Sequence, residues 1–354
     1  MPEQRNLILA IVLSVTIIIA FQYFYELPRI KESRQQETIR TEQAVEEGSE
    51  ATPGGEAIAP SPPGASSAAR PPEIARSEVI EGADRVEIDN GRIRGSFSLA
   101  GGRIDNLILS DYKLTTQPNS PDVALLTPPG SLQPYFVEFG WVSVDQSVPV
   151  PGRDAVWSTD ATELRPGQPV TLTWDNGEGL RFERRIEIDD AYMFTISQRV
   201  VNDSEEPVSL YPYGLVSRWG TPETLGFFIL HEGPIGVLNG TLEEIDYDDL
   251  QEDGIIEMPS QGGWLGFTDK YWLTALVPDQ ASELTATFRD NPVDGQDRYQ
   301  VDYLRTPITV PAGGTIETTD RLFAGAKVVG ELDRYSEQYG IPLFDRAVDF
   351  GWFY

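Results

Sequence analysis

The chain reads RVEIDNGRIRGSFSL over residues 85–99, and this stretch holds its clearest structural pattern. The Asn90-Gly91 pair tolerates positive φ and predicts a tight turn between two strands. After the turn, apolar and polar side chains alternate: Ile93, Phe97 and Leu99 fall on one face, and Arg92, Arg94, Ser96 and Ser98 on the other. Such a period of two predicts strands with one buried face.

The same pattern recurs along the chain. Further strands are predicted at residues 170–174, 180–188, 192–201 and 208–217, and Asp175-Asn176-Gly177 repeats the turn signal. No amphipathic helix of ten residues alternates with them, which argues against a parallel βαβ sheet. We therefore predict a mainly β fold, a large antiparallel β-sandwich that occupies about residues 82–325.

Helical spacing is found near the end of the chain, in the segment 326–354, for which we predict helices. The apolar positions of its first helix are Val328, Val329, Leu332, Tyr335 and Tyr339. Gly340 and Pro342 then predict its end. This apolar stripe could pack on the sandwich, face the membrane surface or meet a partner. We rank this helix first as a possible partner or coupling element.

A long apolar run, residues 7–25, stands near the start of the chain and is broken only by Ser14, Thr16 and Gln22. Its length is close to the roughly 20 residues that cross about 30 Å of hydrocarbon. A secretory signal peptide would have a shorter apolar core and a small-x-small cleavage site. We predict an uncleaved transmembrane anchor, with membrane or interface residues Leu7, Phe21, Tyr23, Phe24 and Tyr25. The flanking charges leave its orientation undecided.

Residues 26–81 have the composition of a linker. The part from 51 to 72 is dominated by Pro, Gly, Ala and Ser, and such a sequence buries too little apolar surface to offset its ordering entropy. We expect a disordered, flexible connection between the anchor and the sandwich.

Charge and composition exclude several classes of function. The 354 residues carry a formal net charge of −29, which argues against nucleic acid as a partner. The chain has no cysteine, which excludes disulfides, thiolate metal sites and a cysteine nucleophile. We expect no cofactor, no metal and no catalytic residue.

Three clusters nevertheless suggest specific chemistry. His231 with Glu232 could serve as an acid–base pair, but neighbours on a strand point to opposite faces, and a loop histidine is the preferred interpretation. The acidic residues between 243 and 253 lack the spacing of an EF-hand, which favours a solvated acidic loop. The aromatic residues Trp264, Phe267, Tyr271 and Trp272 are expected in the core, although one of them could line a groove.

Four motifs in register resemble one family. They are Gln4-Arg5-Asn6-Leu7-Ile8-Leu9, Leu107-Ile108-Leu109-Ser110-Asp111-Tyr112, Gly262-Gly263-Trp264-Leu265-Gly266-Phe267 with Tyr271-Trp272-Leu273-Thr274-Ala275, and Val348-Asp349-Phe350-Gly351-Trp352. In this order they resemble the bacterial YidC/Oxa/Alb family of membrane protein insertases. The resemblance covers the whole chain.

The resemblance implies a bacterial inner-membrane protein. Residues 1–6 would be cytoplasmic, 7–25 the anchor, and the main domain a periplasmic β-supersandwich similar to galactose mutarotases. Its partners would be nascent inner-membrane proteins, the Sec translocon, SecDF and the lipid bilayer. The family's insertase core of five further spans is not in this sequence, so we expect this portion to anchor and dock.

The chain ends on aromatic residues that are unusual for a soluble terminus. Trp352, Phe353 and Tyr354 are expected at the membrane interface or at the start of a missing second span. The alternative function is a membrane-anchored periplasmic β-sandwich module that binds carbohydrate or protein. A mutarotase-like enzyme is a further alternative.

Overall fold

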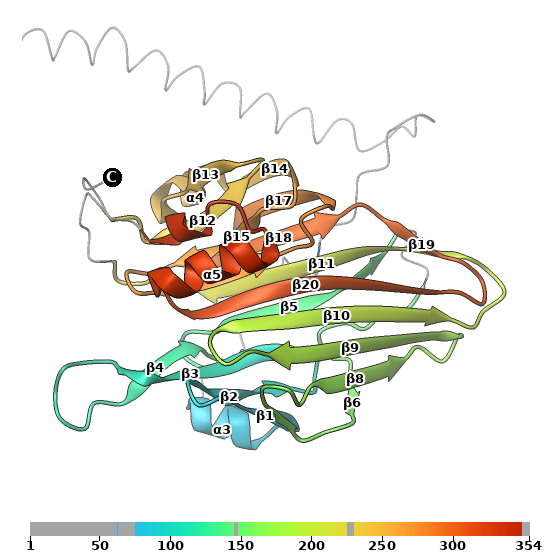
Figure 1. Cartoon of the computed structure of the whole chain (residues 1–354), viewed down its shortest axis with the longest axis horizontal. Helices are drawn as coiled ribbons and strands as arrows, with labels where there is room; N and C mark the ends of the chain where they lie inside the picture. The colour runs from blue at the N-terminus through green and yellow to red at the C-terminus, as the bar shows by residue number, and fades with distance from the viewer. Residues whose placement is uncertain (1–61, 63–74, 145–147, 225–229, 349–354) are drawn as a thin grey trace, which may run out of the picture. The chain divides into compact units, whose positions relative to one another are not determined.

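The computed structural model describes residues 62, 75–144, 148–224 and 230–348 (Figure 1). The predicted anchor, most of the predicted linker and the terminal aromatic residues lie outside this range. Their predicted interface residues, Leu7, Phe21, Tyr23, Phe24, Tyr25, Trp352, Phe353 and Tyr354, therefore stay predictions. None of the helices within the described ranges is long and apolar enough to cross a membrane.

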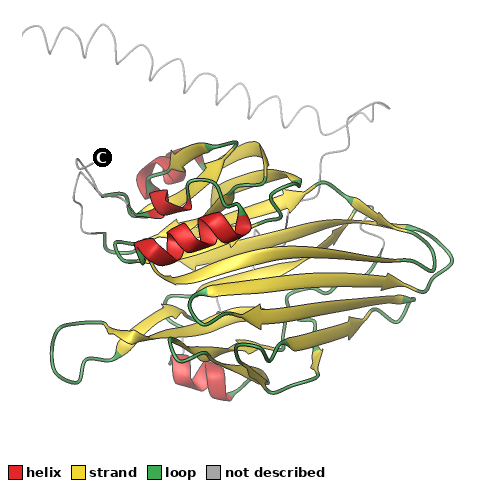
Figure 2. Ribbon diagram, viewed as in Figure 1, coloured by secondary structure: helices red, strands yellow, loops and turns green. Residues whose placement is uncertain are grey.

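Two large sheets form the described domain (Figures 1 and 2). The 11-stranded sheet has the order β14-β17-β18-β11-β5-β3-β2-β1-β7, with β19 paired to β11 and β4 paired to β3. Its strands are β1 (Arg85–Asp89), β2 (Ile93–Ser98), β3 (Arg103–Lys113), β4 (Asp122–Leu126), β5 (Tyr135–Ser143), β7 (Glu163–Leu164), β11 (Val208–Trp219), β14 (Ile255–Gln261), β17 (Glu283–Asp290), β18 (Arg298–Arg305) and β19 (Ile308–Val310).

The 9-stranded sheet has the order β13-β12-β15-β16-β20-β10-β9-β8-β6. Its strands are β6 (Ser158–Thr159), β8 (Val170–Asp175), β9 (Leu180–Ile188), β10 (Met193–Asn202), β12 (Gly233–Leu238), β13 (Thr241–Glu244), β15 (Trp264–Thr268), β16 (Trp272–Val277) and β20 (Thr315–Ala326). The helices are α3 (Arg76–Glu81), α4 (Tyr247–Asp253), α5 (Val329–Tyr339) and the 3-10 helix η2 (Phe344–Ala347).

The strand pairing confirms the predicted mainly β, antiparallel fold. All the described strand pairs are antiparallel except β1 with β7, which pair in parallel at Glu87 with Glu163 and Ile88 with Leu164. The β1–β2 hairpin is joined by the predicted Asn90-Gly91 turn, and Gly91 has a φ of 88°. Because this φ is in the left-handed region, glycine is the residue that adopts it without strain.

One apolar core holds the two sheets together. Phe97 in β2, Phe182 in β9 and Phe323 in β20 are all fully buried within it. Burial of each such ring stabilises the fold by about 1.5–3 kcal/mol relative to exposure. Of these three rings the alternation read from the sequence had placed Phe97 on the buried face, together with Ile93, which is also fully buried.

Part of the predicted polar face of β2 is buried as well, which the alternation did not indicate: Ser96 and Ser98 are buried, while Arg94 is exposed. Ser96 is only 1% exposed, because Asn106 on β3 donates to its Oγ over 2.8 Å. Arg76 of helix α3 in turn bonds Asn106. Helix α3 lies inside the range predicted as linker, so a segment without a sequence signal covers these polar groups.

Candidate functional site

The C-terminal helix α5 packs on the 9-stranded sheet through aromatic side chains. Leu332 and Tyr335 are fully buried, and the Tyr335 ring meets Phe323 of β20 edge-on at 5.9 Å. Phe344 of η2 lies edge-on to Phe323 at 5.5 Å and to Trp264 of β15 at 5.4 Å. Both helices that follow the last strand thus contribute buried side chains to the core.

The turn between α5 and η2 is fixed by hydrogen bonds. Gly340 adopts the left-handed conformation that ends the helix, as its position predicted. Ser336 donates from its hydroxyl to the Ile341 carbonyl over 2.7 Å. The Trp264 indole nitrogen donates to the Pro342 carbonyl over 3.0 Å. We call α5 and η2 together the α5–η2 joint.

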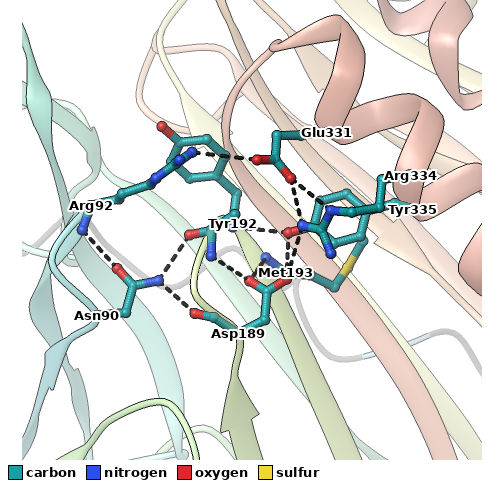
Figure 3. Close-up of polar contacts among 9 residues, drawn as sticks. Asn90, Arg92, Asp189, Tyr192, Met193, Glu331, Arg334 and Tyr335 are labelled. Carbon is teal, nitrogen blue, oxygen red and sulfur yellow. Dashed lines mark hydrogen bonds and ion pairs between the residues drawn. The ribbon is translucent and has the colours of Figure 1, made fainter.

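A polar cluster attaches α5 to the β9–β10 turn (Figure 3). The Tyr335 hydroxyl donates to Asp189 Oδ2 over 2.5 Å and accepts the Tyr192 backbone N–H over 3.2 Å. Asp189 Oδ1 accepts the backbone N–H groups of Ala191 and Met193. The phenol of Tyr335 is therefore saturated on both its donor and its acceptor side.

Asn90 extends this cluster to the other sheet (Figure 3). Its side-chain amide donates to the carbonyls of Asp189 over 2.8 Å and Ala191 over 2.9 Å. Its Oδ1 accepts the backbone N–H groups of Arg92 and Ile93. The β1–β2 turn of the 11-stranded sheet and the β9–β10 turn of the 9-stranded sheet are thus joined where α5 is attached.

Ion pairs complete the cluster. Arg334 contacts Glu331 over 2.5 Å and Asp189 over 3.6 Å, and Glu331 also lies 3.6 Å from Arg92. Hydrogen bonding to Glu331 raises the pKa of Arg334 above its ordinary value. Burial, and then the hydrogen bond to Asp189, raise the pKa of Tyr335. A neutral, saturated phenol beside paired charges is suited to holding a helix in place and not to proton transfer.

The five predicted residues of the coupling helix separate into two groups. Leu332 and Tyr335 are buried, and Tyr339 stacks on Tyr335 with ring centroids 6.1 Å apart. Val328 and Val329 are instead 38% and 40% exposed. The helix begins only at Val329, so these two valines lie at its N-cap and its first residue, two and three positions after the end of β20.

A second feature is an open cleft of about 600 Å³ at one end of the domain. It is bordered by the residue after β3, the β4–β5 loop, the end of β11 and the β15–β16 turn. Its apolar and aromatic lining includes Leu114, Leu132, Tyr135, Trp219, Tyr271 and Trp272. We call it the end cleft.

Arg218 lies at the end cleft and is held from two sides. Its Nη1 contacts Asp269 Oδ1 over 2.8 Å, and its guanidinium lies 4.9 Å from the centre of the Tyr135 ring. Burial lowers the pKa of Arg218, but the charge of Asp269, its hydrogen bond to Arg218 and the nearby phenols of Tyr247 and Tyr135 together raise that pKa above its ordinary value. The neighbouring Trp219 has a cation–π contact of its own, since Arg298 lies over its ring at 3.8 Å.

The alternative acid–base pair is not assembled. His231 Nε2 lies 3.0 Å from the Pro234 carbonyl, and its Nδ1 lies 3.5 Å from Asp246. Glu232 instead accepts the backbone N–H of Lys270 over 3.1 Å. The two side chains engage different groups, as the loop interpretation predicted.

The acidic segment is partly helical, which corrects the predicted loop. Residues 247–253 form α4, whose Tyr247 and Leu250 are buried against the domain. The described residues contain no group of three or more His, Cys, Asp or Glu side chains with the geometry of a metal site.

The aromatic motif is divided between core and cleft, and two of its four residues, Tyr271 and Trp272, line the cleft where one was expected. Trp264 and Phe267 are fully buried, while Tyr271 is 58% exposed at the end cleft. Trp272 is half-buried and meets Tyr112 edge-on at 5.0 Å. The link from Asn90 to Asp189 and the burial of Phe344 were not predicted, because neither has a local sequence signal.

Comparisons with known proteins identify the family. The family model described as the YidC periplasmic domain matches residues 85–354. The membrane protein insertase YidC of Bradyrhizobium diazoefficiens is 43% identical over 378 residues, which cover 100% of this chain and 60% of that protein. The YidC protein of Granulibacter bethesdensis is 43% identical over 361 residues, with 99% of this chain and 60% of that protein covered.

The chain thus spans about 60% of the length of these curated relatives. Among solved structures, a galactose mutarotase-like protein from Lactobacillus casei has a TM-score of 0.44 and 11% identity, with 68% of this chain and 99% of that chain covered. The family match and the whole-chain identity lead to one conclusion: the chain belongs to the YidC family of membrane protein insertases, and residues 85–354 correspond to its periplasmic domain.

Proposed function

We propose that this chain is the N-terminal part of a membrane protein insertase and chaperone that helps to insert and fold inner-membrane proteins. The support is identity to YidC insertases over the whole length of the chain. In this proposal residues 7–25 anchor the protein in the inner membrane, 26–81 are a tether, and the sandwich is periplasmic. The insertase core belongs to the remaining part of the longer protein.

The α5–η2 joint is the observation that carries the role of this part. Tyr335 and Phe344 are fully buried, and Tyr335 is bonded to the β9–β10 turn. A helix held in this way transmits the position of the sandwich to the chain that follows Val348. The part described here therefore positions and docks, without covalent chemistry and without a cofactor.

The partners follow from the family. They are nascent inner-membrane proteins, the bilayer and, in the Sec-dependent mode, the Sec translocon with SecDF. Because the chain carries a net charge of −29, nucleic acid is excluded from this set.

A matched pair of insertions tests the positioning role. The coding sequence after the Tyr354 codon is read first, and the longer protein is assayed for client insertion in proteoliposomes. Five residues of Gly and Ser placed directly after Val348 uncouple the joint from the chain that follows it. We expect the insertion of client proteins to fall several-fold. The same five residues placed after Glu205, in the exposed segment 205–207 between β10 and β11, are expected to leave client insertion unchanged.

Equal activity of the two insertion variants would contradict the positioning role. A stop codon directly after Tyr354 would contradict the insertase function itself. The proposed topology has its own test, because the chain contains no cysteine. A single cysteine at Val156, which is 67% exposed, should react with a membrane-impermeant maleimide added from the periplasmic side.

The end cleft supports a second candidate, a carbohydrate-binding module. Trp219 and Trp272 line it beside Arg218 and Glu232, a combination that suits sugar rings and hydroxyls. A titration with sugars that shifts tryptophan fluorescence at low millimolar concentration would support this module. Unchanged fluorescence throughout that range would remove it.

A further inference from the structure

Lysine is rare in this chain, and its positions are not scattered. Only four lysines occur, and three of them lie in the described domain. Each of the three is followed directly by a large exposed apolar side chain, in the pairs Lys113-Leu114, Lys270-Tyr271 and Lys327-Val328.

Contacts between different strands bring these pairs to one end of the domain. The Lys327 backbone N–H donates to the Tyr271 carbonyl over 2.9 Å. Tyr112, directly before Lys113, meets Trp272 edge-on at 5.0 Å. Leu114, Lys270 and Tyr271 also border the same end cleft.

This end gathers the apolar surface of the domain. Of the nine large hydrophobic residues that are exposed in the described ranges, five lie here. They are Leu114 at 67%, Leu132 at 66%, Tyr271 at 58%, Val329 at 40% and Val328 at 38% exposure. We call these five residues, with Lys113, Lys270 and Lys327, the lysine end.

The charges at the lysine end differ from those of the whole chain. Three of the acidic side chains there are engaged: Asp122 pairs with Lys113 and Arg94, Asp269 pairs with Arg218, and Glu232 accepts the Lys270 backbone N–H, while the exposed Glu223 also borders the cleft. Cations therefore balance anions locally, whereas the chain as a whole carries a net charge of −29. Repulsion from an anionic lipid surface is therefore reduced at this end.

An exposed apolar side chain next to an ammonium group has the chemistry of a membrane interface. Apolar and aromatic side chains enter the headgroup region, while lysine stems bury their methylenes and place the charge at the lipid phosphates. A sugar site would not require aliphatic side chains as exposed as Leu114 and Leu132. The repeated pairing with lysine favours a lipid surface over a sugar.

We propose that the lysine end rests on the phospholipid surface of the membrane, with Leu114, Leu132 and Tyr271 at headgroup depth. The proposal rests on the proposed function in one respect, that the domain lies beside a bilayer. It adds which face of the sandwich meets the lipid and which side chains enter it.

The domain offers a matched pair of reporter positions. Leu114 and Val156 are both 67% exposed. Leu114 directly follows the 11-residue strand β3. Val156 pairs with Ala100, which lies just before the start of β3. At about 3.3 Å per residue the two positions are roughly 35 Å apart along the strand.

The test uses the full chain in vesicles of phosphatidylethanolamine and phosphatidylglycerol. Leu114→Cys or Val156→Cys is labelled with an environment-sensitive fluorophore and quenched with aqueous iodide. We expect a blue shift and several-fold weaker quenching at position 114, and full quenching at 156. Equally strong quenching at both positions would overturn the proposal.

The contribution of the lysines has a separate readout. In the Leu114→Cys protein, we expect K113Q, K270Q and K327Q together to increase iodide quenching several-fold on vesicles with phosphatidylglycerol. On vesicles of phosphatidylcholine alone the same change should be small. If the three substitutions left iodide quenching on anionic vesicles unchanged, the proposed contribution of the lysines to lipid binding would be refuted.

The two proposals fail in different ways. A Leu114 label that stays in water while the insertion after Val348 still lowers client insertion would refute the lipid contact and leave the positioning role intact. If the Leu114 label were protected from iodide but the two insertion variants were equally active, the positioning role would be refuted and the lipid contact would stand.

Discussion

The α5–η2 joint and the lysine end use similar apolar side chains in opposite ways. At the joint, Leu332, Tyr335 and Phe344 are fully buried, and the phenol of Tyr335 has both a donor and an acceptor partner. At the lysine end, Leu114 and Leu132 are about two-thirds exposed, at 67% and 66%.

The difference shows which apolar residues stabilise the fold: those at the joint do, because they are buried. The joint is stabilised by the same close packing that holds the sheets, so it moves with the sandwich. The lysine end contributes little to folding, which leaves its surface available for another phase or partner. The same type of substitution should therefore have very different effects in the two regions.

The largest effect is expected for Phe344→Ala at the joint. The ring packs against Trp264 and Phe323, and removing a buried phenylalanine typically costs about 3–5 kcal/mol. Leu132→Ala at the lysine end is the control and should change the free energy of unfolding by less than about 0.5 kcal/mol. Urea unfolding measures both values, and similar losses for the two variants would erase the contrast.

A buried carboxyl remote from both regions gives a pH-dependent effect. Asp302 is fully buried, and burial raises its pKa to about 6 despite Arg289 and Gln300. The unfolded carboxyl has a pKa near 3.9. The folded state binds this proton more tightly than the unfolded state does. The resulting contribution of Asp302 to the free energy of unfolding is therefore fully present below about pH 4 and is lost as the pH rises through about 6.

The size of this effect follows from the shift. About two pKa units correspond to roughly 3 kcal/mol between pH 4 and pH 8. The free energies of unfolding of wild type and Asp302→Asn are compared at both pH values, because the variant cannot titrate at this position. A difference between the two proteins that is independent of pH would show that Asp302 does not titrate in this range.

Tyr335→Phe should give a smaller loss. The ring stays in place, but the Tyr192 N–H loses its acceptor and Asp189 loses a donor. Leaving such partly buried groups unpaired costs about 1–3 kcal/mol. Tyr271→Phe at the lysine end removes an exposed hydroxyl and should cost almost nothing, so equal losses would argue against the hydrogen-bonded attachment.

The smallest effect is expected from Arg334→Gln. Arg334 is 46% exposed in its pair with Glu331, and ion pairs at such a surface contribute about 0.2–1 kcal/mol. The loss should also shrink in 1 M salt, where exposed charges are screened. A loss above about 2 kcal/mol that persists in salt would mean that Arg334, and not Tyr335, carries the attachment.

The sequence predicted those features that depend on neighbouring residues. The alternation after Asn90 identified Ile93 and Phe97 as core positions, and the spacing of Leu332 and Tyr335 identified the buried face of α5. The motifs also indicated the family that the comparisons then established.

The features that were missed depend on contacts between distant segments. Ser96 is buried because α3 and Asn106 cover it. Asn90 bonds the carbonyl of Asp189, a partner 99 residues away. Val328 matched the helical spacing but is the N-cap residue, before the first turn of the helix, and its side chain is 38% exposed. A period in the sequence reports the preferred face of an element and not what covers it.

Native-state hydrogen exchange tests the central claim, that the joint is part of the folded sandwich while the lysine end is open. The account predicts that amides from Leu332 to Ser336 exchange only by global unfolding, at the rate of Leu322 and Phe323 in β20. The amides of Thr116 and Asn119, in the exposed loop that follows Leu114, should exchange orders of magnitude faster. If the amides of α5 exchanged as fast as that loop, the helix would open independently of the sandwich, and the account would be wrong.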